Sequence, residues 1–280
     1  MRLTPLLGIL LPLAACGGSH EPPPPSAAEI EETQVTEATD LCMKATQGDA
    51  ALRAPAIEKL RDMTEAYPNN ARAFFYLGMC SILDLTEGDN LGAIVDVDPA
   101  LSRAHELAPD DHRIAGNMWL ARFNIAFAFK DQERIDAAVQ GLIAASDADI
   151  FASFVLGTAL PRLEPSTGYP QLAVERLEAL VEACSTLEYC RNSPIVLHHD
   201  PGLYMQLGDA YARVGDGAKA AGAYSKALTA DGYATWAILD EAKAWADGIE
   251  ERVMLHTDAD PKNDPGQFLE GTRTCSGCHG

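Results

Sequence analysis

One spacing pattern recurs five times along the chain and restricts the possible folds more than any other feature. Each copy places small or apolar residues three or four positions apart, which is the spacing of one helix face. The copies are Ala56, Leu60 and Met63; Val97, Leu101 and Ala104; Ala138, Leu142 and Ala145; Ala173, Leu177 and Leu180; and Ala220, Tyr224 and Ala227. No stretch alternates strictly with period two, so we expect a chain of helices.

A second pattern precedes three of these copies. It reads Phe74-x2-Leu77-Gly78, Ser153-x2-Leu156-Gly157 and Tyr204-x2-Leu207-Gly208-x2-Tyr211. The small residues would let two paired helices approach closely, while the aromatic residues would fill the gaps between them. The sequence therefore predicts repeated helix hairpins.

Together the two patterns resemble the tetratricopeptide repeat (TPR), which has a large aromatic residue, Leu-Gly and Tyr, followed by Ala, an aromatic residue and Ala. The resemblance covers about residues 37–252 and is strongest after Tyr204. It implies an all-α, TPR-like solenoid of antiparallel helix pairs, whose concave groove binds a peptide, protein or small ligand. A final helix after Thr235, carrying Trp236 and Trp245, would cap the stack.

The N-terminus indicates export. An apolar run, residues 3–13, follows Arg2 and is too short to span a bilayer, which is typical of a signal peptide. It ends at Leu13-Ala14-Ala15-Cys16, which resembles the lipobox of bacterial lipoproteins. The resemblance implies a signal peptide over residues 1–15 and a lipid anchor on Cys16. An ordinary secretory signal cleaved near Ala15 is the alternative.

Residues 16–36 are expected to form a disordered tether. Their proline run, Pro22–Pro25, lacks N–H donors and favours an extended chain. By similarity to enteric lipoprotein sorting, Gly17 and Gly18 after the anchor favour the outer membrane. The body would then face the periplasm as part of the cell envelope.

The C-terminus carries the motif that indicates chemistry. Cys275-x-x-Cys278-His279 is the attachment pattern of c-type haem. Cysteines at this spacing bond to the two vinyl groups of one porphyrin, and the adjacent His binds the iron as the proximal ligand. The resemblance to c-type cytochromes covers only these five residues, because just Gly280 follows and no pocket of the usual kind can form.

The polar tail, residues 253–280, would therefore leave its single covalent haem exposed to water. An exposed site favours the more charged ferric state and hence a low reduction potential. The distal ligand would be His256, with Met254, His198, His199 and water as further candidates. Three other interpretations stay open: a Cys275–Cys278 disulfide, a zinc site, or a motif that binds nothing.

Four other cysteines could form disulfides in an oxidising compartment. Cys184 and Cys190 flank one short loop and are a candidate pair. Cys42 and Cys80 lie in the first helices of neighbouring predicted repeats, where they would either pair or stay buried as free thiols.

The net charge of −20 excludes binding to nucleic acid, because phosphates would be repelled. A solvated acidic surface explains this charge, and a basic partner protein attracted by it is the alternative. The sequence contains no Gly-rich phosphate loop, no Gly-x-Ser-x-Gly and no His-Glu-x-x-His, so we expect no enzyme.

These features predict a lipoprotein scaffold that binds a partner in its groove and carries one haem c for electron transfer, with a basic redox protein as a candidate partner. The alternative is a pure binding module without haem, such as the helical-repeat lipoproteins that accompany TRAP transporters, in which the two tail cysteines form a disulfide.

Overall fold

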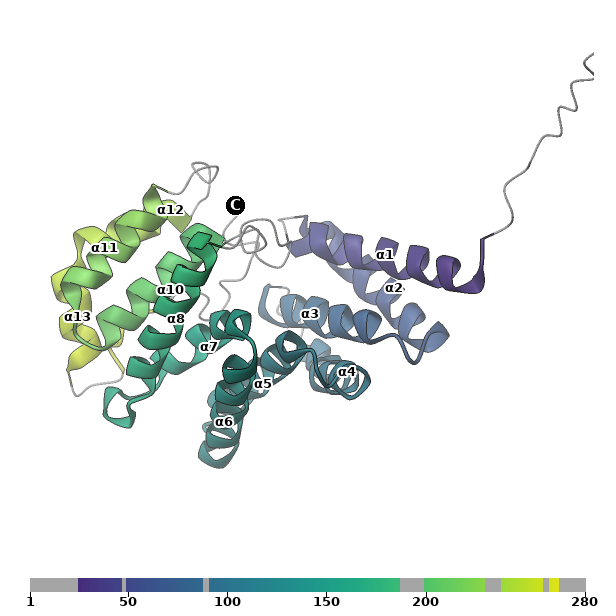
Figure 1. The fold of residues 1–280 in the computed structure, drawn as a ribbon, viewed down its shortest axis with the longest axis horizontal. Helices are drawn as coiled ribbons and strands as arrows, with labels where there is room; N and C mark the ends of the chain where they lie inside the picture. The colour runs from purple at the N-terminus through teal and green to yellow at the C-terminus, as the bar shows by residue number, and fades with distance from the viewer. Residues whose placement is uncertain are drawn as a thin grey trace, which may run out of the picture.

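The computed structural model of the chain describes residues 25–46, 49–87, 91–186, 199–229, 238–258 and 262–266. All regular structure in these residues is helical, and none of them lies in a strand. The α-helices, labelled in Figure 1, are α1 (Ala27–Thr46), α2 (Arg53–Ala66), α3 (Ala71–Glu87), α4 (Ile94–Leu107), α5 (His112–Ala128), α6 (Gln132–Ala148), α7 (Ser153–Ala159), α8 (Tyr169–Thr186), α10 (His199–Arg213), α11 (Gly217–Leu228), α12 (Ile238–Asp247) and α13 (Ile249–Thr257). Short 3-10 helices are η1 (Ala50–Leu52), η2 (Leu91–Ala93), η3 (Ile150–Ala152), η4 (Leu160–Arg162) and η5 (Pro165–Thr167). The all-α prediction is confirmed.

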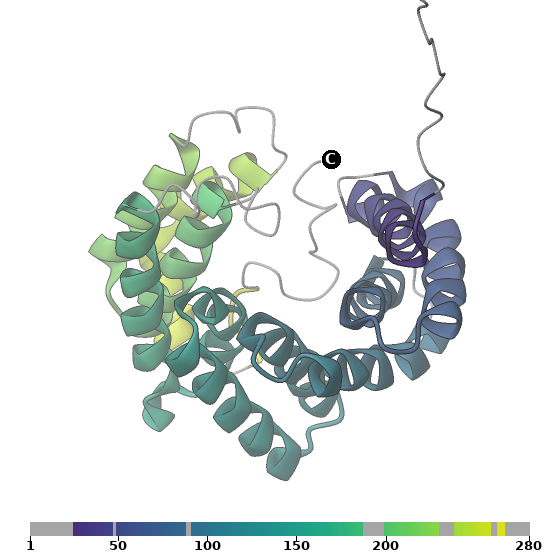
Figure 2. The ribbon, with the colours of Figure 1, turned by 45° about the vertical axis from the view of Figure 1, so that its right-hand side comes forward.

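Ten of these α-helices form five antiparallel pairs, which we number as repeats 1 to 5: α1/α2, α3/α4, α5/α6, α7/α8 and α10/α11. Each second helix also packs against the first helix of the next pair, and α11 packs in the same way against α12. The helices therefore follow one another around an open arc, with repeat 1 at one end and repeat 5 at the other (Figure 2). The predicted solenoid is confirmed.

The first helices of the repeats form the inner layer of this arc. Helix α1 packs on α3, α5 packs on α7, and α7 packs on α10. Consecutive second helices have no contact of comparable extent in the described residues. In a curved stack the layer whose members touch has the smaller radius, so the first helices line the concave side.

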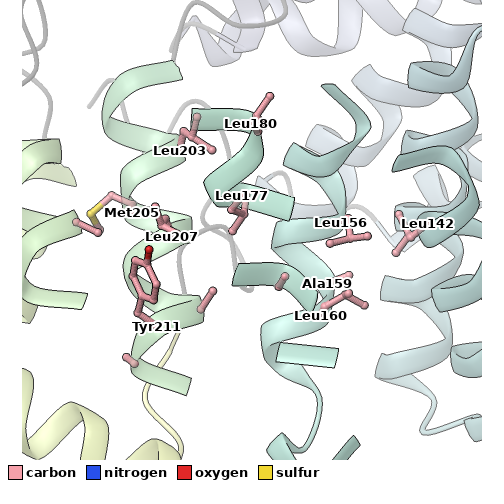
Figure 3. Packing of buried hydrophobic residues seen from close by; sticks show 14 of the residues in the cluster. Leu142, Leu156, Ala159, Leu160, Leu177, Leu180, Leu203, Met205, Leu207 and Tyr211 are labelled. Atoms are coloured by element: carbon pink, nitrogen blue, oxygen red, sulfur yellow. The ribbon is translucent and has the colours of Figure 1, made fainter. Parts of the chain in front are cut away.

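The residues of the recurring second-helix pattern form the core in every repeat. All are buried except Met63, which is partly buried. Between repeats 3 and 5 the side chains of Leu142, Leu156, Leu177 and Leu207 lie between neighbouring helices (Figure 3). They belong to one apolar cluster that runs from α5 to α12. The periodicity of the sequence thus identified the buried faces correctly.

A close contact inside the helix pair explains the Leu-Gly element. A methyl group on Gly78 would lie 2.6 Å from Cγ of Leu101, and one on Gly157 would lie 2.6 Å from Cδ2 of Leu177. A methyl group on Gly208 would come within 3.0 Å of the Tyr224 ring. The glycine therefore allows a large side chain of the second helix to lie directly against the first-helix backbone.

Repeat 3 makes the same contact with the two roles exchanged. Here the glycine is Gly141 of the second helix, and a methyl group on it would come within 3.0 Å of the Trp119 indole of the first helix. The large and small partners are thus swapped between α5 and α6. This exchange explains why the repeat pattern is weakest in the middle of the sequence.

The turn between α10 and α11 is built from local hydrogen bonds. Gly215 adopts a positive φ of 86°, and the Asp216 N–H donates to the Tyr211 carbonyl at 2.9 Å. The Asp216 carboxylate then accepts from the Lys219 N–H at 3.1 Å and so caps the next helix. Lys130, with a φ of 56°, takes the place of the glycine in the corresponding turn of repeat 3.

The first helix begins ten residues before the predicted domain boundary. Helix α1 starts at Ala27, so the last part of the predicted tether, residues 16–36, is helical. The Ser26 N–H donates to the Glu29 carboxylate at 2.7 Å, and the Ser26 hydroxyl accepts from the Glu29 N–H at 3.3 Å. This reciprocal pair is a capping box, and Ser-x-x-Glu is a sequence signature of a helix start.

The last helix also extends beyond its predicted end. Helices α12 and α13 are two halves of one capping helix that bends at Gly248. Its ladder continues through the bend, since the Gly248 N–H donates to the Ala244 carbonyl and the Arg252 N–H donates to the Gly248 carbonyl, both at 3.0 Å. Residues 253–280 were predicted to be an irregular tail, but the helix continues to Thr257.

A disulfide joins the first helices of repeats 1 and 2. Cys42 of α1 and Cys80 of α3 are bonded, with 5.8 Å between their Cα atoms, and both are buried. The sequence left pairing and free thiols open, and the structure shows pairing. The bond closes a loop with a sequence separation of 38, which corresponds to about 4 kcal/mol of stabilisation in the loop-entropy account.

The close contact at Gly208 can be tested by adding a methyl group. Gly208→Ala forces the Tyr224 ring or α10 to shift, so we expect a loss of about 1–3 kcal/mol in the free energy of unfolding, measured by urea denaturation. Gly222→Ala is the matched control, because a methyl group there meets nothing within 4 Å and should stabilise α11 by about 0.5–1 kcal/mol. Equal effects of the two substitutions would contradict the packing role of Gly208.

Candidate functional site

The end of the solenoid contains a buried polar network under the capping helix. The Tyr224 hydroxyl donates to the Asp209 carboxylate at 2.6 Å, and Arg252 donates to the same carboxylate at 2.6 Å and to the Tyr224 oxygen at 3.1 Å. The guanidinium also stacks on Trp245, 4.0 Å from the ring centroid. Arg252 therefore ties α10 and α11 to the capping helix.

A second buried arginine, Arg213 at the end of α10, connects three further segments. Its guanidinium donates to the Leu163 carbonyl at 3.3 Å, to the His256 carbonyl at 2.9 Å and to the Asp264 carboxylate at 2.7 Å. The side chain of Arg213 is only 3% exposed. Arg213 therefore links repeat 4, the end of α13 and the segment that follows it.

Both arginines hold residues 262–266, which we call the strap. Asp264 binds Arg213, and the Gly266 carbonyl accepts from Arg252 at 2.7 Å. The strap lies between α13 and the terminal motif in the sequence. The two contacts therefore hold the chain against the end of the solenoid as far as Gly266.

Burial and charge shape the ionisation of this network. Burial and the neighbouring Asp209 carboxylate hold the pKa of Tyr224 well above its ordinary value. Burial opposes ionisation of Arg252, but Asp209 and Tyr224 outweigh it and raise its pKa. Burial also raises the pKa of Asp264, although Arg213 acts in the opposite direction. At neutral pH the network is thus an ion-paired cluster in which Tyr224 stays protonated.

His256, predicted as the distal haem ligand, lies inside this network. Its side chain is fully buried, and neither ring nitrogen has a hydrogen-bond partner among the residues that the structure describes. Burial, with added repulsion from Arg252 and Arg213, lowers the pKa of His256 to about 3. The imidazole is therefore neutral, and it could reach an iron atom only if the capping helix opened.

The other candidate ligands are placed less favourably or lie outside the described residues. Met254 is 59% exposed on α13, so its thioether is accessible from solvent. His199 is the first residue of α10, and His198 lies outside the described part of the chain. Of the predicted distal ligands whose side chains the structure describes, Met254 is exposed and His256 is buried.

The residues of the haem motif, Cys275, Cys278 and His279, lie outside the described residues, as does Cys16. Their predicted roles stay predictions. Cys184, at the end of α8, is disulfide-bonded. Its predicted partner, Cys190, is also outside the described residues, so that pairing stays a prediction.

Two features are absent from the described residues: a membrane-spanning helix and a cluster of metal-binding side chains. Within these ranges no helix has the length and apolar character needed to cross a membrane. In the same ranges, no group of three or more His, Cys, Asp or Glu side chains is arranged to hold a metal ion.

Comparisons with known proteins bear on the fold. No family model matches the chain, and no curated protein matches it either. Among solved structures, a thermophilic TPR protein of Thermus thermophilus superposes with a TM-score of 0.52 at 14% sequence identity. The match covers 79% of this chain and 99% of that protein. At this identity the likeness shows the fold alone. The chain has the fold of a TPR protein.

The spacing of five residues near the end of the chain indicates the capping helix and its polar network. Ala242, Trp245, Ile249, Arg252 and His256 are spaced three, four, three and four residues apart. This is the spacing of one buried helix face, so it predicts a helix that continues past residue 252. Two polar side chains on such a face also indicate a buried polar cluster, although their partners cannot be read from the spacing.

Replacing His256 should stabilise the protein at low pH. A protonated imidazole is costly inside the fold, whereas the unfolded chain takes up the proton below about pH 6.5, so stability is lost as the pH falls from there toward 3. We therefore expect the unfolding free energy of His256→Leu, relative to wild type, to rise by about 2 kcal/mol between pH 7 and pH 5.

Urea denaturation at the two pH values measures this difference. His256→Gln, which keeps a polar side chain without a titrating ring, is the control and should show the same relative gain. Parallel pH profiles of wild type and both variants would contradict a neutral, buried His256.

Proposed function

We propose that this protein is an exported, lipid-anchored scaffold that binds a protein partner on its concave face and carries one haem c on its C-terminal arm, residues 267–280. The observation that carries the proposal is the combination of a TPR-type solenoid with a Cys-x-x-Cys-His motif that begins nine residues beyond Gly266, whose carbonyl is bound by the buried Arg252. The solenoid supplies the binding surface, and the motif supplies the redox chemistry.

The fold supports the scaffold part of the proposal. Stacked helix pairs generate an extended concave surface, which is the usual binding surface of repeat proteins. In this chain the surface is lined by α1, α3, α5, α7 and α10. The net charge of −20 would steer a basic partner toward it and repel a nucleic acid.

The cysteines support export. The Cys42–Cys80 bond and the bonded state of Cys184 are typical of proteins in oxidising compartments, since cytosolic thiols are kept reduced. This observation is independent of the apolar run and Cys16 at the N-terminus. An exported protein also reaches the compartment in which c-type haem is attached.

The haem would depend mainly on the arm itself. Cys275 and Cys278 would hold it through thioethers, and His279 would bind the iron; when bound, the group supplies one-electron redox chemistry. Because the motif belongs to a polar tail, residues 253–280, we expect the haem to be in contact with water. We therefore expect a comparatively low reduction potential.

The intact mass of the mature protein tests the haem directly. The protein is produced together with a cytochrome c assembly system, as wild type and as the Cys275→Ala, Cys278→Ala double variant. We expect wild type to exceed the variant by the mass of one haem, after correction for the two substitutions.

A mass difference explained by the substitutions alone would refute haem attachment. The pure binding module would then be the better account, with the two tail cysteines free or joined to each other. His279→Ala serves as a further comparison, because it removes the iron ligand but leaves both thioether positions.

A further inference from the structure

We propose that the strap, residues 262–266, is a latch, closed by Arg213 and Arg252, that sets how far the C-terminal motif can reach. The part of this inference that concerns haem rests on the proposed function above. The latch itself rests only on contacts between described residues.

The latch is anchored in the rigid end of the solenoid. Arg213 and Arg252 are each at least nine-tenths buried, and each has two further hydrogen-bond acceptors besides the strap: Arg213 binds the Leu163 and His256 carbonyls, and Arg252 binds Asp209 and Tyr224. Arg252 in particular is held by Asp209 and Tyr224 whether or not the strap is present. The two guanidinium groups therefore form fixed attachment points, and the strap is the part that can detach.

The strap is attached to the two arginines by two contacts, and Asn263 also donates to the Asp258 carboxylate at 3.0 Å at the end of α13. Asp264 provides the ion pair to Arg213, and the Gly266 carbonyl provides the bond to Arg252. The Asp264 side chain is 23% exposed, so water can compete for it when the strap moves. The described strap residues contribute no buried apolar side chain that would hold it after these bonds break.

Closing the latch halves the number of residues between Cys275 and the last residue held by the solenoid. Cys275 is nine residues beyond Gly266, which allows a reach of about 30 Å for a fully extended chain. If the strap is released, the free chain starts at Thr257, and the eighteen residues to Cys275 reach about 60 Å.

This geometry restricts the partner of the arm. With the latch closed, any group bonded to Cys275 stays within about 30 Å of Gly266. A protein that exchanges electrons with this group must therefore approach the group within this radius of Gly266. With the latch open, Cys275 could lie up to about 60 Å from Thr257.

Spin labels can measure the reach without any haem. The full chain is produced without a cytochrome c assembly system, with Cys278→Ser to leave Cys275 as one label site and Met254→Cys as the other. Met254 is exposed on α13, so a label there should not disturb the core. Pulsed electron paramagnetic resonance gives the distance distribution, and hydrogen exchange reports on the strap amides.

Asp264→Asn opens the latch, because it removes the ion pair and leaves the Arg213 guanidinium with its two carbonyl acceptors. We expect the label distances to broaden and their upper edge to lengthen by up to about 30 Å. We also expect the strap amides to exchange about tenfold faster or more. Asp247→Asn is the control: it removes an exposed carboxylate that pairs with Lys243 on the same capping helix, and should change neither signal.

Two results would overturn the latch. One is an Asp264→Asn protein with the distances and exchange of its parent. The other is a parent protein whose strap amides already exchange at the rate of an unfolded chain. Neither depends on haem, so a failure of haem attachment leaves this test unaffected and a failure of the latch leaves the haem proposal standing.

Discussion

The close approach of two helices within each repeat is the constraint on which the rest of the structure depends. In repeats 2, 4 and 5 a glycine of the first helix lies against a large side chain of the second, and repeat 3 reverses the two roles. This contact sets the distance between the paired helices, and the distance determines how the pair stacks on its neighbours. The curvature of the arc, and with it the concave layer of first helices, follows from the repeated contact.

The same contact determines the environment of the buried network. Because Gly208 has no side chain, the Tyr224 ring lies under α10 and its hydroxyl reaches Asp209. Asp209 and Tyr224 together give the Arg252 guanidinium partners that compensate for its burial. Arg252 in turn holds the Gly266 carbonyl at the root of the arm. A packing requirement inside one helix pair thus extends, through hydrogen bonds, to the position of the strap.

The parts of the fold that depend on periodicity could be predicted from the sequence. The spacing from Ala56 to Ala227 identified the buried face of all five second helices, and Leu207-Gly208 identified a close contact. The helix ends were less predictable, because they depend on local hydrogen bonds such as the capping box at Ser26 and on the partners that let Arg252 be buried. The network itself required knowledge of which side chains meet, since Asp209 and Arg252 are 43 residues apart.

The cysteines and histidines illustrate the same limit. The spacing of Cys42 and Cys80 allowed either a bond or two free thiols, and only the stacking of α1 on α3 brings them together. His256 looked like an accessible ligand because it was assigned to a polar tail. Placed on α13 it is buried, neutral and flanked by two arginines, so the sequence identified a notable residue but not its environment.

The central claim is that one chain combines a membrane-anchored TPR scaffold with a haem-bearing arm. The most direct test is a reduced-minus-oxidised absorption spectrum of the membrane and soluble fractions of cells that express the protein with a cytochrome c assembly system. We predict a sharp haem band in the membrane fraction for wild type. Cys16→Ser should reduce the band in that fraction, because the unlipidated protein is either released or left unprocessed. Wild-type protein that gives no such band in either fraction would contradict the account.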